Sequence, residues 1–173
     1  MKRVLLVVLA SAVCVAAAHP LGAAEPRKPG PEHQRFAYLV GDWTVEGMDG
    51  QARVTGKASF EWWAGGFHLL RRWDIQYPGV SEKSFAVYEY DPESSSYSFH
   101  WINNSGRSGV RRGTVSGDTW TFYSDEKTAD GKPLKARLLV KELPPDAMTW
   151  TWGGSTDGQT WDDSSPLTFR RVK

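Results

Sequence analysis

Apolar and polar residues alternate along most of the chain after the first forty positions. In residues 53–63, one side of an extended strand would carry Val54, Ala58 and Phe60, while the other side is mainly polar. Residues 67–76 repeat the pattern with Leu69 on the apolar side. Successive side chains of a β-strand point to opposite faces, so this alternation predicts strands with one buried face. We therefore expect an all-β protein.

Roughly ten such segments follow one another, at the spacing typical of a β-barrel or sandwich. Pairs such as Asp49-Gly50 and Asp130-Gly131 between them favour tight hairpins, which join antiparallel neighbours. Closing the sheet on itself removes its exposed edges. We therefore predict an antiparallel up-and-down barrel. Its predicted strands cover residues 42–47, 53–63, 67–76, 84–91, 97–103, 108–115, 119–123, 134–141, 148–152 and 167–172.

One segment near the N-terminus, from Pro31 to Val40, predicts a short helix instead. Proline suits the first position of a helix, and Phe36 contributes to an apolar stripe. The residues before this segment are rich in proline and charge. We therefore predict a flexible lead-in over residues 25–35 and a single domain over residues 36–173.

The first 24 residues have the pattern of a secretory signal peptide. Lys2 and Arg3 precede an apolar run over residues 4–18, and the small residues Gly22-Ala23-Ala24 close the stretch. The run is shorter than the roughly 18 residues that a membrane-spanning helix needs. We therefore expect cleavage between Ala24 and Glu25 and a periplasmic or secreted protein with no integral membrane segment.

Cys14 is the only cysteine, and it lies inside that apolar run. A lipoprotein anchored through Cys14 is disfavoured because bulky Val13 precedes it where a small residue is expected. The mature chain would have no cysteine, and its length suffices for a core without disulfides. Loss of Lys2 and Arg3 leaves 19 basic against 20 acidic residues. This balance gives no electrostatic footprint for nucleic acid or an anionic membrane.

The nine tryptophans bear on function as well as on fold. Large indoles are costly to expose, so most must face a core, a ligand or a partner. Arg71 shares their predicted inner face, where its guanidinium must meet a carboxylate such as Glu89, aromatic faces, water or an anionic ligand. The residues that we predict to bind a ligand are Trp62, Arg71, Trp73, Tyr88, Trp101, Trp120 and Trp150.

No catalytic or metal site is predicted. The histidines lack the close spacing of a zinc site, and no Gly-x-Ser-x-Gly motif is present. The adjacent Asp162 and Asp163 are interpreted as a solvated turn. Ser155 to Trp161 resembles the Asp-box of sialidases and other β-propellers but is one residue shorter. In such a box, side-chain hydrogen bonds stabilise a hairpin turn, which implies no enzymatic activity.

Two motifs at opposite ends of the domain resemble the signature of calycins. Gly41 and Trp43 open the first predicted strand, and Arg170 and Arg171 lie on the last. In calycin barrels, which include lipocalins, the tryptophan closes one end of the barrel and the arginine packs over it. The resemblance implies a lipocalin-like barrel with these four residues in structural roles.

The whole mature chain also resembles the bacterial DUF1579 family of lipocalin-like proteins. The family has no established biochemical function, so this resemblance supports the fold and leaves the function open. The matching segments are Leu39 to Trp43, Phe60 to Trp62 with Gly65-Gly66, Tyr88 to Asp91, His100-Trp101 with Asn104 to Gly106, Gly117 to Trp120, and Arg170-Arg171.

A more distant resemblance to nitrobindin-type haem barrels makes haem an alternative cofactor. In that family the histidine that binds the haem iron lies near the C-terminal strands, and this chain has no histidine after His100. His100 itself could bind haem only if its strand were inverted relative to the predicted faces. We therefore predict no cofactor.

Three classes of function remain open. The first is an exported binding protein that holds a small apolar or amphipathic molecule, which can be anionic, inside the barrel. The second is a filled barrel without ligand that acts through its surface, for example through Trp63, Ile102 and Tyr123. The third is an enzyme, disfavoured because no acid–base pair is evident on the inner face. We expect a monomer or homodimer.

Overall fold

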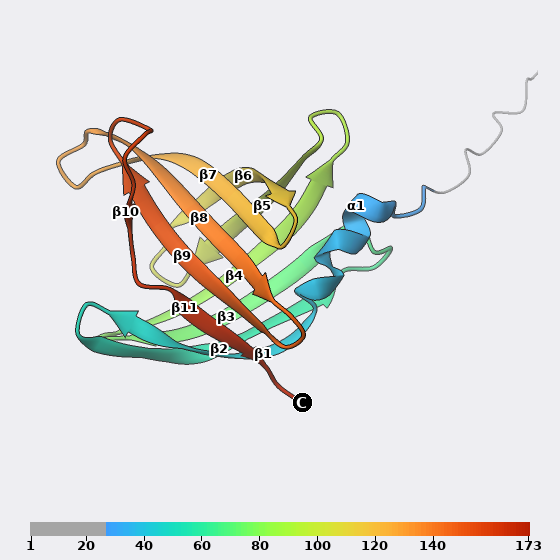
Figure 1. Cartoon of the computed structure of the whole chain (residues 1–173), viewed down its shortest axis with the longest axis horizontal. Helices are drawn as coiled ribbons and strands as arrows, with labels where there is room; N and C mark the ends of the chain where they lie inside the picture. Colours follow the sequence, from blue (N-terminus) through green and yellow to red (C-terminus); the bar gives the residue numbers. More distant parts are fainter. Residues whose placement is uncertain (1–26) are drawn as a thin grey trace, which may run out of the picture.

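The computed structural model describes residues 27–173, which form one closed antiparallel β-barrel (Figure 1). The predicted signal peptide and Cys14 lie outside the described residues. Each barrel strand from β1 to β9 pairs with the next along the chain, and β11 lies between β9 and β1 and closes the sheet. The all-β up-and-down prediction is therefore confirmed.

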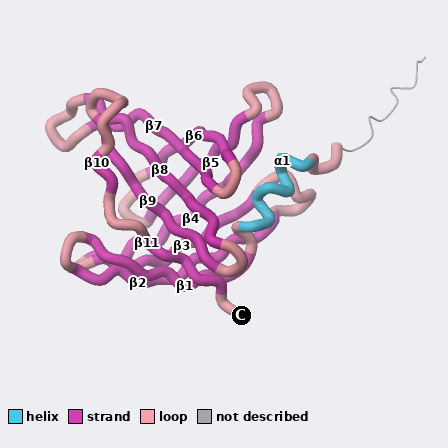
Figure 2. The backbone as a smooth tube through the Cα atoms, in the orientation of Figure 1, coloured by secondary structure: helices cyan, strands magenta, loops and turns pink. Residues whose placement is uncertain are grey.

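The barrel has ten strands, and a further short strand pairs with the end of β9. Loops join the strands at the two ends of the barrel, and strand makes up most of the described chain (Figure 2). The strands are β1 (Gly41–Asp49), β2 (Ala52–Trp62), β3 (Leu69–Tyr77), β4 (Val80–Asp91), β5 (Ser96–Asn103), β6 (Ser108–Ser116), β7 (Thr119–Lys127), β8 (Pro133–Leu143), β9 (Ala147–Ser155), the short β10 (Asp162–Asp163) and β11 (Leu167–Arg171).

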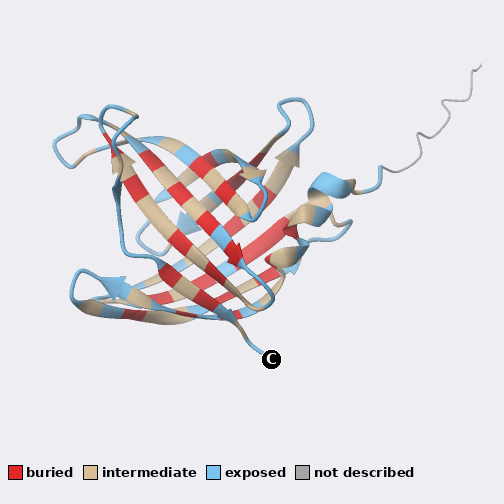
Figure 3. Ribbon diagram, viewed as in Figure 1, coloured by how far each residue is buried: buried red, intermediate tan, exposed pale blue. Residues whose placement is uncertain are grey.

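The strand register aligns inward-facing side chains of neighbouring strands in rows around the barrel. Leu69 of β3 pairs with Tyr88 of β4, which pairs with Phe99 of β5, and all three are buried. Buried positions alternate with more exposed ones along much of the barrel sheet (Figure 3). The sequence left open which face of β4 points inward. Ala86 and Tyr88 are buried while Val87 is only half-buried, so the former face lines the interior.

The N-terminal segment forms two short helical turns that cover one end of the barrel. The single helix predicted from Pro31 to Val40 is an α-helical turn, α1 (Pro31–Gln34), followed by a 3-10 turn, η1 (Arg35–Tyr38). Phe36 is fully buried and stacks on Trp120 with 5.5 Å between ring centroids. Neither turn, nor any other helix in residues 27–173, has the length and apolarity to span a membrane.

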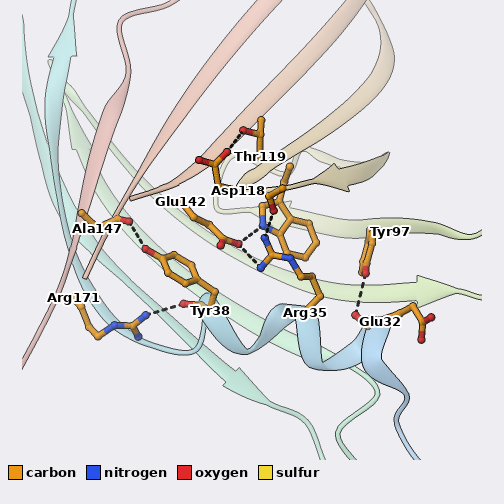
Figure 4. Close-up of polar contacts among 11 residues, drawn as sticks. Glu32, Arg35, Tyr38, Tyr97, Asp118, Thr119, Glu142, Ala147 and Arg171 are labelled. Carbon is orange, nitrogen blue, oxygen red and sulfur yellow. Dashed lines mark hydrogen bonds and ion pairs between the residues drawn. The ribbon is translucent and has the colours of Figure 1, made fainter. Parts of the chain in front are cut away.

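Polar contacts attach these turns to the barrel (Figure 4). The Tyr97 hydroxyl donates a 3.1 Å hydrogen bond to the backbone oxygen of Glu32. The Tyr38 hydroxyl donates a 2.5 Å bond to the backbone oxygen of Ala147, in the first residue of β9. Because the bonds reach strands far apart in the barrel, the helical segment holds this end closed.

Trp43 and Arg171 seal the barrel beside the helical segment. The Trp43 indole donates a 2.8 Å hydrogen bond to the Leu39 carbonyl, and the Arg171 guanidinium lies 4.2 Å from the indole centroid. Arg170 points outward, with an exposed 3.6 Å ion pair to Glu46. The structure therefore assigns the packing role over the tryptophan to Arg171, and Arg170 has no part in it.

Gly41 opens β1 with a φ of 124°, a value that favours glycine. A Cβ atom at this position would lie 2.8 Å from Nη1 of Arg171, and the same nitrogen donates a hydrogen bond to the Val40 carbonyl. The backbone conformation therefore favours glycine here, and an added Cβ would displace the Arg171 guanidinium. Glycine allows the guanidinium to reach the chain at the start of the barrel.

Candidate ligand-binding site

A cavity of about 380 Å³ opens into the barrel at the end opposite the helical segment. Its rim includes Asp49 at the end of β1, Tyr77 at the end of β3, Glu82 in β4 and Arg107 before β6. Its deeper walls come from inward-facing residues in the middle of strands, mostly aromatic. These include Arg71, Trp73, Phe99, Trp101, Arg111, Leu138, Trp150 and Trp152.

A larger groove of about 820 Å³ lies along β1 to β5, where it is lined by outward-facing side chains such as Phe85. Charged side chains of this groove pair at the surface: Lys83 contacts Asp74, and Arg72 contacts Glu61. Some buried polar side-chain atoms in residues 27–173 have no hydrogen-bond partner, but none of these atoms belongs to an outward-facing residue of the groove. The interior cavity is therefore the stronger candidate site.

Arg71 enters the cavity from the middle of β3, and only 5% of the residue is exposed. Its guanidinium carbon lies 4.9 Å from the ring centroid of Trp73 and 5.6 Å from that of Trp150. Nη2 donates a 2.8 Å hydrogen bond to Ser84 Oγ, while Nε is buried without a partner. Cation–π contacts of this kind contribute about 0.5–2 kcal/mol each, far less than the cost of burying an unpaired charge.

No carboxylate forms an ion pair with Arg71 in the described part of the chain. Glu89, the partner considered from the sequence, contacts Ser98 at 2.8 Å and His100 at 3.2 Å instead. Those contacts lie on the outer face of β4 and β5, because Tyr88 and Phe99 on the alternate positions face inward. Arg71 is thus a buried cation held by aromatic rings and one hydroxyl group.

Arg111 of β6 brings a second guanidinium to the same cavity, and it is 9% exposed. Its Nη2 donates a 2.8 Å hydrogen bond to Glu126, whose carboxylate also accepts a 2.9 Å bond from Ser124. Its Nη1 is buried without a partner. Burial lowers the pKa of Arg111, and the Glu126 carboxylate opposes that shift. Even a lowered arginine pKa leaves the group charged at neutral pH.

Two neutral donors near these arginines also lack partners. The indole nitrogen of Trp73 and the hydroxyl of Tyr88 are both buried without a hydrogen bond. Burial raises the pKa of Tyr88, and the positive charges of Arg71 and Arg111 oppose that rise. Buried polar groups are usually satisfied, so such a concentration of unpaired donors indicates a place where a ligand or water completes the bonds.

Aromatic rings form the side walls of the cavity. Trp150 lies 5.4 Å from Trp73 and 5.9 Å from Trp152, measured between ring centroids. Trp101 lies against Gly109 of the neighbouring strand, where an added Cβ would come within 2.9 Å of the indole nitrogen. The glycine therefore gives the indole room beside the backbone, and the walls present ring faces and edges to the cavity.

Residues 28–171 match the family model described as "Protein of unknown function (DUF1579)". The chain belongs to the DUF1579 family. The resemblance noted in the sequence is thereby confirmed, and the family name carries no activity. Comparison with curated proteins gives no match.

The fold is similar to a solved structure described as "Crystal Structure of Rv2717c from M. tuberculosis". The TM-score is 0.55 with 13% sequence identity, and the similarity covers 83% of this chain and 99% of that one. At this identity the similarity bears on the barrel fold alone. The function of this member of the family must therefore be argued from its own cavity.

Four of the seven predicted binding residues line the cavity, and they are Arg71, Trp73, Trp101 and Trp150. Trp62 and Trp120 face inward but lie at the closed end, where both pack against Phe36. Tyr88 lies in the wall beneath the cavity, with its ring stacked on Phe99. The structure thus divides the predicted set between an open and a closed half of the barrel.

Sequence reasoning missed Arg111, Glu126 and Trp152 as cavity residues. The inward positions on either side of Arg111 are Gly109 and Gly113, so no apolar alternation marked the inner face around it. The signal available in the sequence was the alternation of Trp120 and Phe122 in the next strand, which indicates a face but not the register that pairs it with Arg111.

The described histidines do not fit a haem held inside the barrel. His100 lies on the outer face against Glu89, and His33 packs against Phe67 and Tyr90 beside the helical turns. His68 lies in the connection between β2 and β3 and does not line the cavity. No histidine or cysteine lines the cavity, although haem iron is most often held by such ligands. Residues 27–173 also contain no group of three or more His, Cys, Asp or Glu side chains placed to hold a metal ion.

Proposed function

We propose that this protein binds a small organic molecule inside its barrel. The observation that carries the proposal is a cavity of about 380 Å³ with a buried arginine in its wall that has no carboxylate partner. Ligand sites are typically concave, mostly apolar, and furnished with a few convergent polar groups. The deep aromatic walls and the guanidinium of Arg71 match that description. The ligand is amphipathic, with its apolar part against the indoles.

The filled-barrel alternative requires that the aromatic side chains occupy the whole interior. The closed half of the barrel is packed in this way, with Phe36, Trp120 and Phe122 stacked in sequence. The open half retains a cavity within the roughly 300–1,000 Å³ range of small-molecule sites, which favours a ligand. An enzymatic role finds less support because the deep walls carry no pair of groups suited to acid–base chemistry.

The most direct experiment is native mass spectrometry of the full chain expressed with its own leader and isolated from the export compartment. We expect a mature mass that corresponds to a chain starting at Glu25, together with an adduct of a small organic molecule. Cleavage elsewhere would change the export proposal without affecting the cavity. A spectrum free of any adduct, combined with no response to added ligands, would contradict the binding proposal.

Tryptophan fluorescence provides the second readout for ligand binding. Trp152 lines the cavity and is half-buried, so Trp152→Ala is expected to weaken binding by about three- to tenfold, as the loss of an aromatic contact implies. Trp63 is exposed outside the barrel and is the matched control. Trp63→Ala should remove one fluorophore and leave the affinity unchanged. Equal effects of the two substitutions would place the ligand elsewhere.

A further inference from the structure

The geometry points to a monocarboxylate as the ligand of this cavity, with its carboxylate bound between Arg71 and Arg111 and its apolar body directed toward the open end. This inference rests on the proposed function and adds the chemical class of the ligand. It also assigns Arg111, together with Arg71, as the pair of residues that determine specificity.

The two arginines lie on either side of the strand that carries Phe99. Phe99 of β5 pairs directly with Arg111 of β6 in the strand register. The guanidinium carbon of Arg71, two strands away on β3, lies 6.0 Å from the Phe99 ring centroid. The two arginines thus approach the same part of the cavity from opposite sides of Phe99.

The unpaired donors match the acceptors of a carboxylate. Nε of Arg71, Nη1 of Arg111 and Nε1 of Trp73 are all buried without partners, and all three residues line the cavity. A carboxylate has two oxygens with about four lone-pair sites, and it accepts guanidinium N–H groups in its plane. A carboxylate therefore has the acceptor chemistry that these residues lack, whereas a neutral hydrocarbon would leave the donors unpaired.

The net charge of the cavity residues favours a ligand with a single negative charge. Deep in the cavity, Arg71 and Arg111 supply two positive charges, and Glu126 neutralises one through its bond to Nη2 of Arg111. One net positive charge remains for the ligand to compensate. A phosphate dianion would bring an excess negative charge close to the Glu126 carboxylate, and the two like charges would repel.

The rim favours one acid group over two. Asp49 and Glu82 lie at the mouth of the cavity with Arg107 as the single cation, so the rim carries a net negative charge. A ligand with a second carboxylate at its outer end would meet these groups. The arrangement therefore orients an amphipathic monoanion, because its charged end is attracted inward and a charged outer end is repelled.

Binding of three matched probes by calorimetry tests the inference on the full-length protein. We would use 3-phenylpropionate, its uncharged amide 3-phenylpropionamide, and 2-phenylethyl phosphate. The carboxylate is expected to bind at least about tenfold more tightly than the amide, as charge-assisted hydrogen bonds imply. It should also bind more tightly than the phosphate at pH 7.5. An amide that binds as tightly as the carboxylate, or a phosphate that binds more tightly, would overturn the inference.

Each arginine has an outward-facing neighbour that serves as its control. Arg71→Gln and Arg111→Gln should each weaken carboxylate binding by about tenfold or more and change amide binding by less than about threefold. Arg72→Gln and Arg112→Gln remove charges from exposed positions on the same strands and should leave both affinities unchanged. If an inward variant and its outward control lost carboxylate affinity equally, only the overall charge of the protein would matter, and the inference would be overturned.

Loss of Arg111 would leave the Glu126 carboxylate without its partner, so a loss of stability must be distinguished from a loss of binding. The double variant Arg111→Gln/Glu126→Gln removes that penalty and is still expected to lose the carboxylate preference. Glu126→Gln alone adds one net positive charge and frees Nη2 of Arg111, and it should shift preference toward the phosphate. An unchanged preference in both variants would overturn the role of Arg111.

The two levels of the proposal can fail separately. If the exported protein carries a bound molecule without an acid group, the cavity binds a ligand and the monocarboxylate inference is wrong. If the exported protein is empty and none of the three probes binds, the proposed function itself is wrong.

Discussion

The guanidinium of Arg35 lies 2.7 Å from the carboxylate of Glu142, and this ion pair attaches the helical segment to the end of β8. The same carboxylate oxygen accepts a 2.7 Å hydrogen bond from the indole of Trp120. Only 6% of Glu142 is exposed, so its charge depends on these two donors. The pair therefore joins the helical turns to the packed aromatic half of the barrel (Figure 4).

Arg35→Met is expected to lower the free energy of unfolding by about 2–3 kcal/mol, because it leaves the buried carboxylate of Glu142 without its cation. Urea denaturation followed by circular dichroism measures this change. The double variant Arg35→Met/Glu142→Gln removes the unpaired charge and should recover part of the loss. A double variant no more stable than the single one would mean that the carboxylate is not the cause.

Arg171→Leu is expected to cost about 1–3 kcal/mol of stability, since it removes a cation–π contact and hydrogen bonds to two carbonyl groups. The guanidinium packs on Trp43 and donates to the backbone oxygens of Val40 and Tyr38. Arg170→Leu is the matched control, with an expected change below about 0.5 kcal/mol, because exposed ion pairs contribute little. Similar losses of Tm for both variants would contradict the assignment of Arg171 as the packing arginine.

Asp157 is expected to make the stability depend on pH in the acidic range. Its Oδ1 accepts 2.8 Å hydrogen bonds from the backbone N–H groups of Gln159 and Thr160 and a 2.9 Å bond from Ser155. These bonds hold the pKa of Asp157 well below its usual range. A depressed native pKa gives stability that is present above the unfolded pKa of about 3.9 and is lost as the pH falls further.

The test for this turn compares Tm at pH 7 and pH 3 in Asp157→Asn and the wild type. We expect the variant to be less stable at pH 7 and the difference to shrink at pH 3, because Asp157 of the unfolded wild-type chain takes up a proton there while the folded chain does not. Asp125→Asn, an exposed carboxylate with a 3.4 Å contact to Lys135, is the control. A difference that stays constant with pH would show that the substitution acts through something other than charge.

Tyr77 at the rim of the cavity should weaken the fold in alkaline solution. Burial, followed by the negative charges of Glu82 and Asp49, raises the pKa of Tyr77 to about 12. The unfolded chain releases this proton near pH 10, so its contribution to stability is full below about pH 10 and is lost as the pH rises to about 12. Tyr77→Phe should reduce the fall in Tm between pH 9 and pH 11.5.

Other tyrosines also have raised pKa values, including Tyr38 and Tyr97, so Tyr77→Phe is expected to remove only part of the alkaline loss. Tyr123→Phe on the exposed outer face is the control. An identical pH dependence of Tm in Tyr77→Phe and Tyr123→Phe would contradict a special role for the rim tyrosine.

Strands and their faces were largely predictable because strand periodicity is local. The predicted segments 53–63 and 67–76 agree with β2 and β3 to within two residues at each end. The cross-strand partners confirm that Phe60 and Leu69 face inward. The one ambiguous strand, β4, carries bulky side chains on both faces, so only its pairing with β3 and β5 decided its orientation.

The depth of each residue along the barrel axis was not predictable. Trp62 and Trp101 both face inward, but Trp62 packs against Phe36 at the closed end while Trp101 lines the cavity. Alternation gives the face of a side chain, whereas its height depends on how neighbouring strands are staggered. This explains why the predicted binding residues divided between the two halves of the barrel.

The alternation of apolar and polar residues was enough to establish an antiparallel barrel and to identify Arg71 as a charge among apolar inward positions. Tertiary structure alone decided that Arg71 has no carboxylate partner, and that Arg111 joins it from β6. The physical reason is the range of the interactions. A strand's inner face follows from residues two apart, but the set of buried donors left unpaired depends on contacts between strands that only the closed barrel brings together.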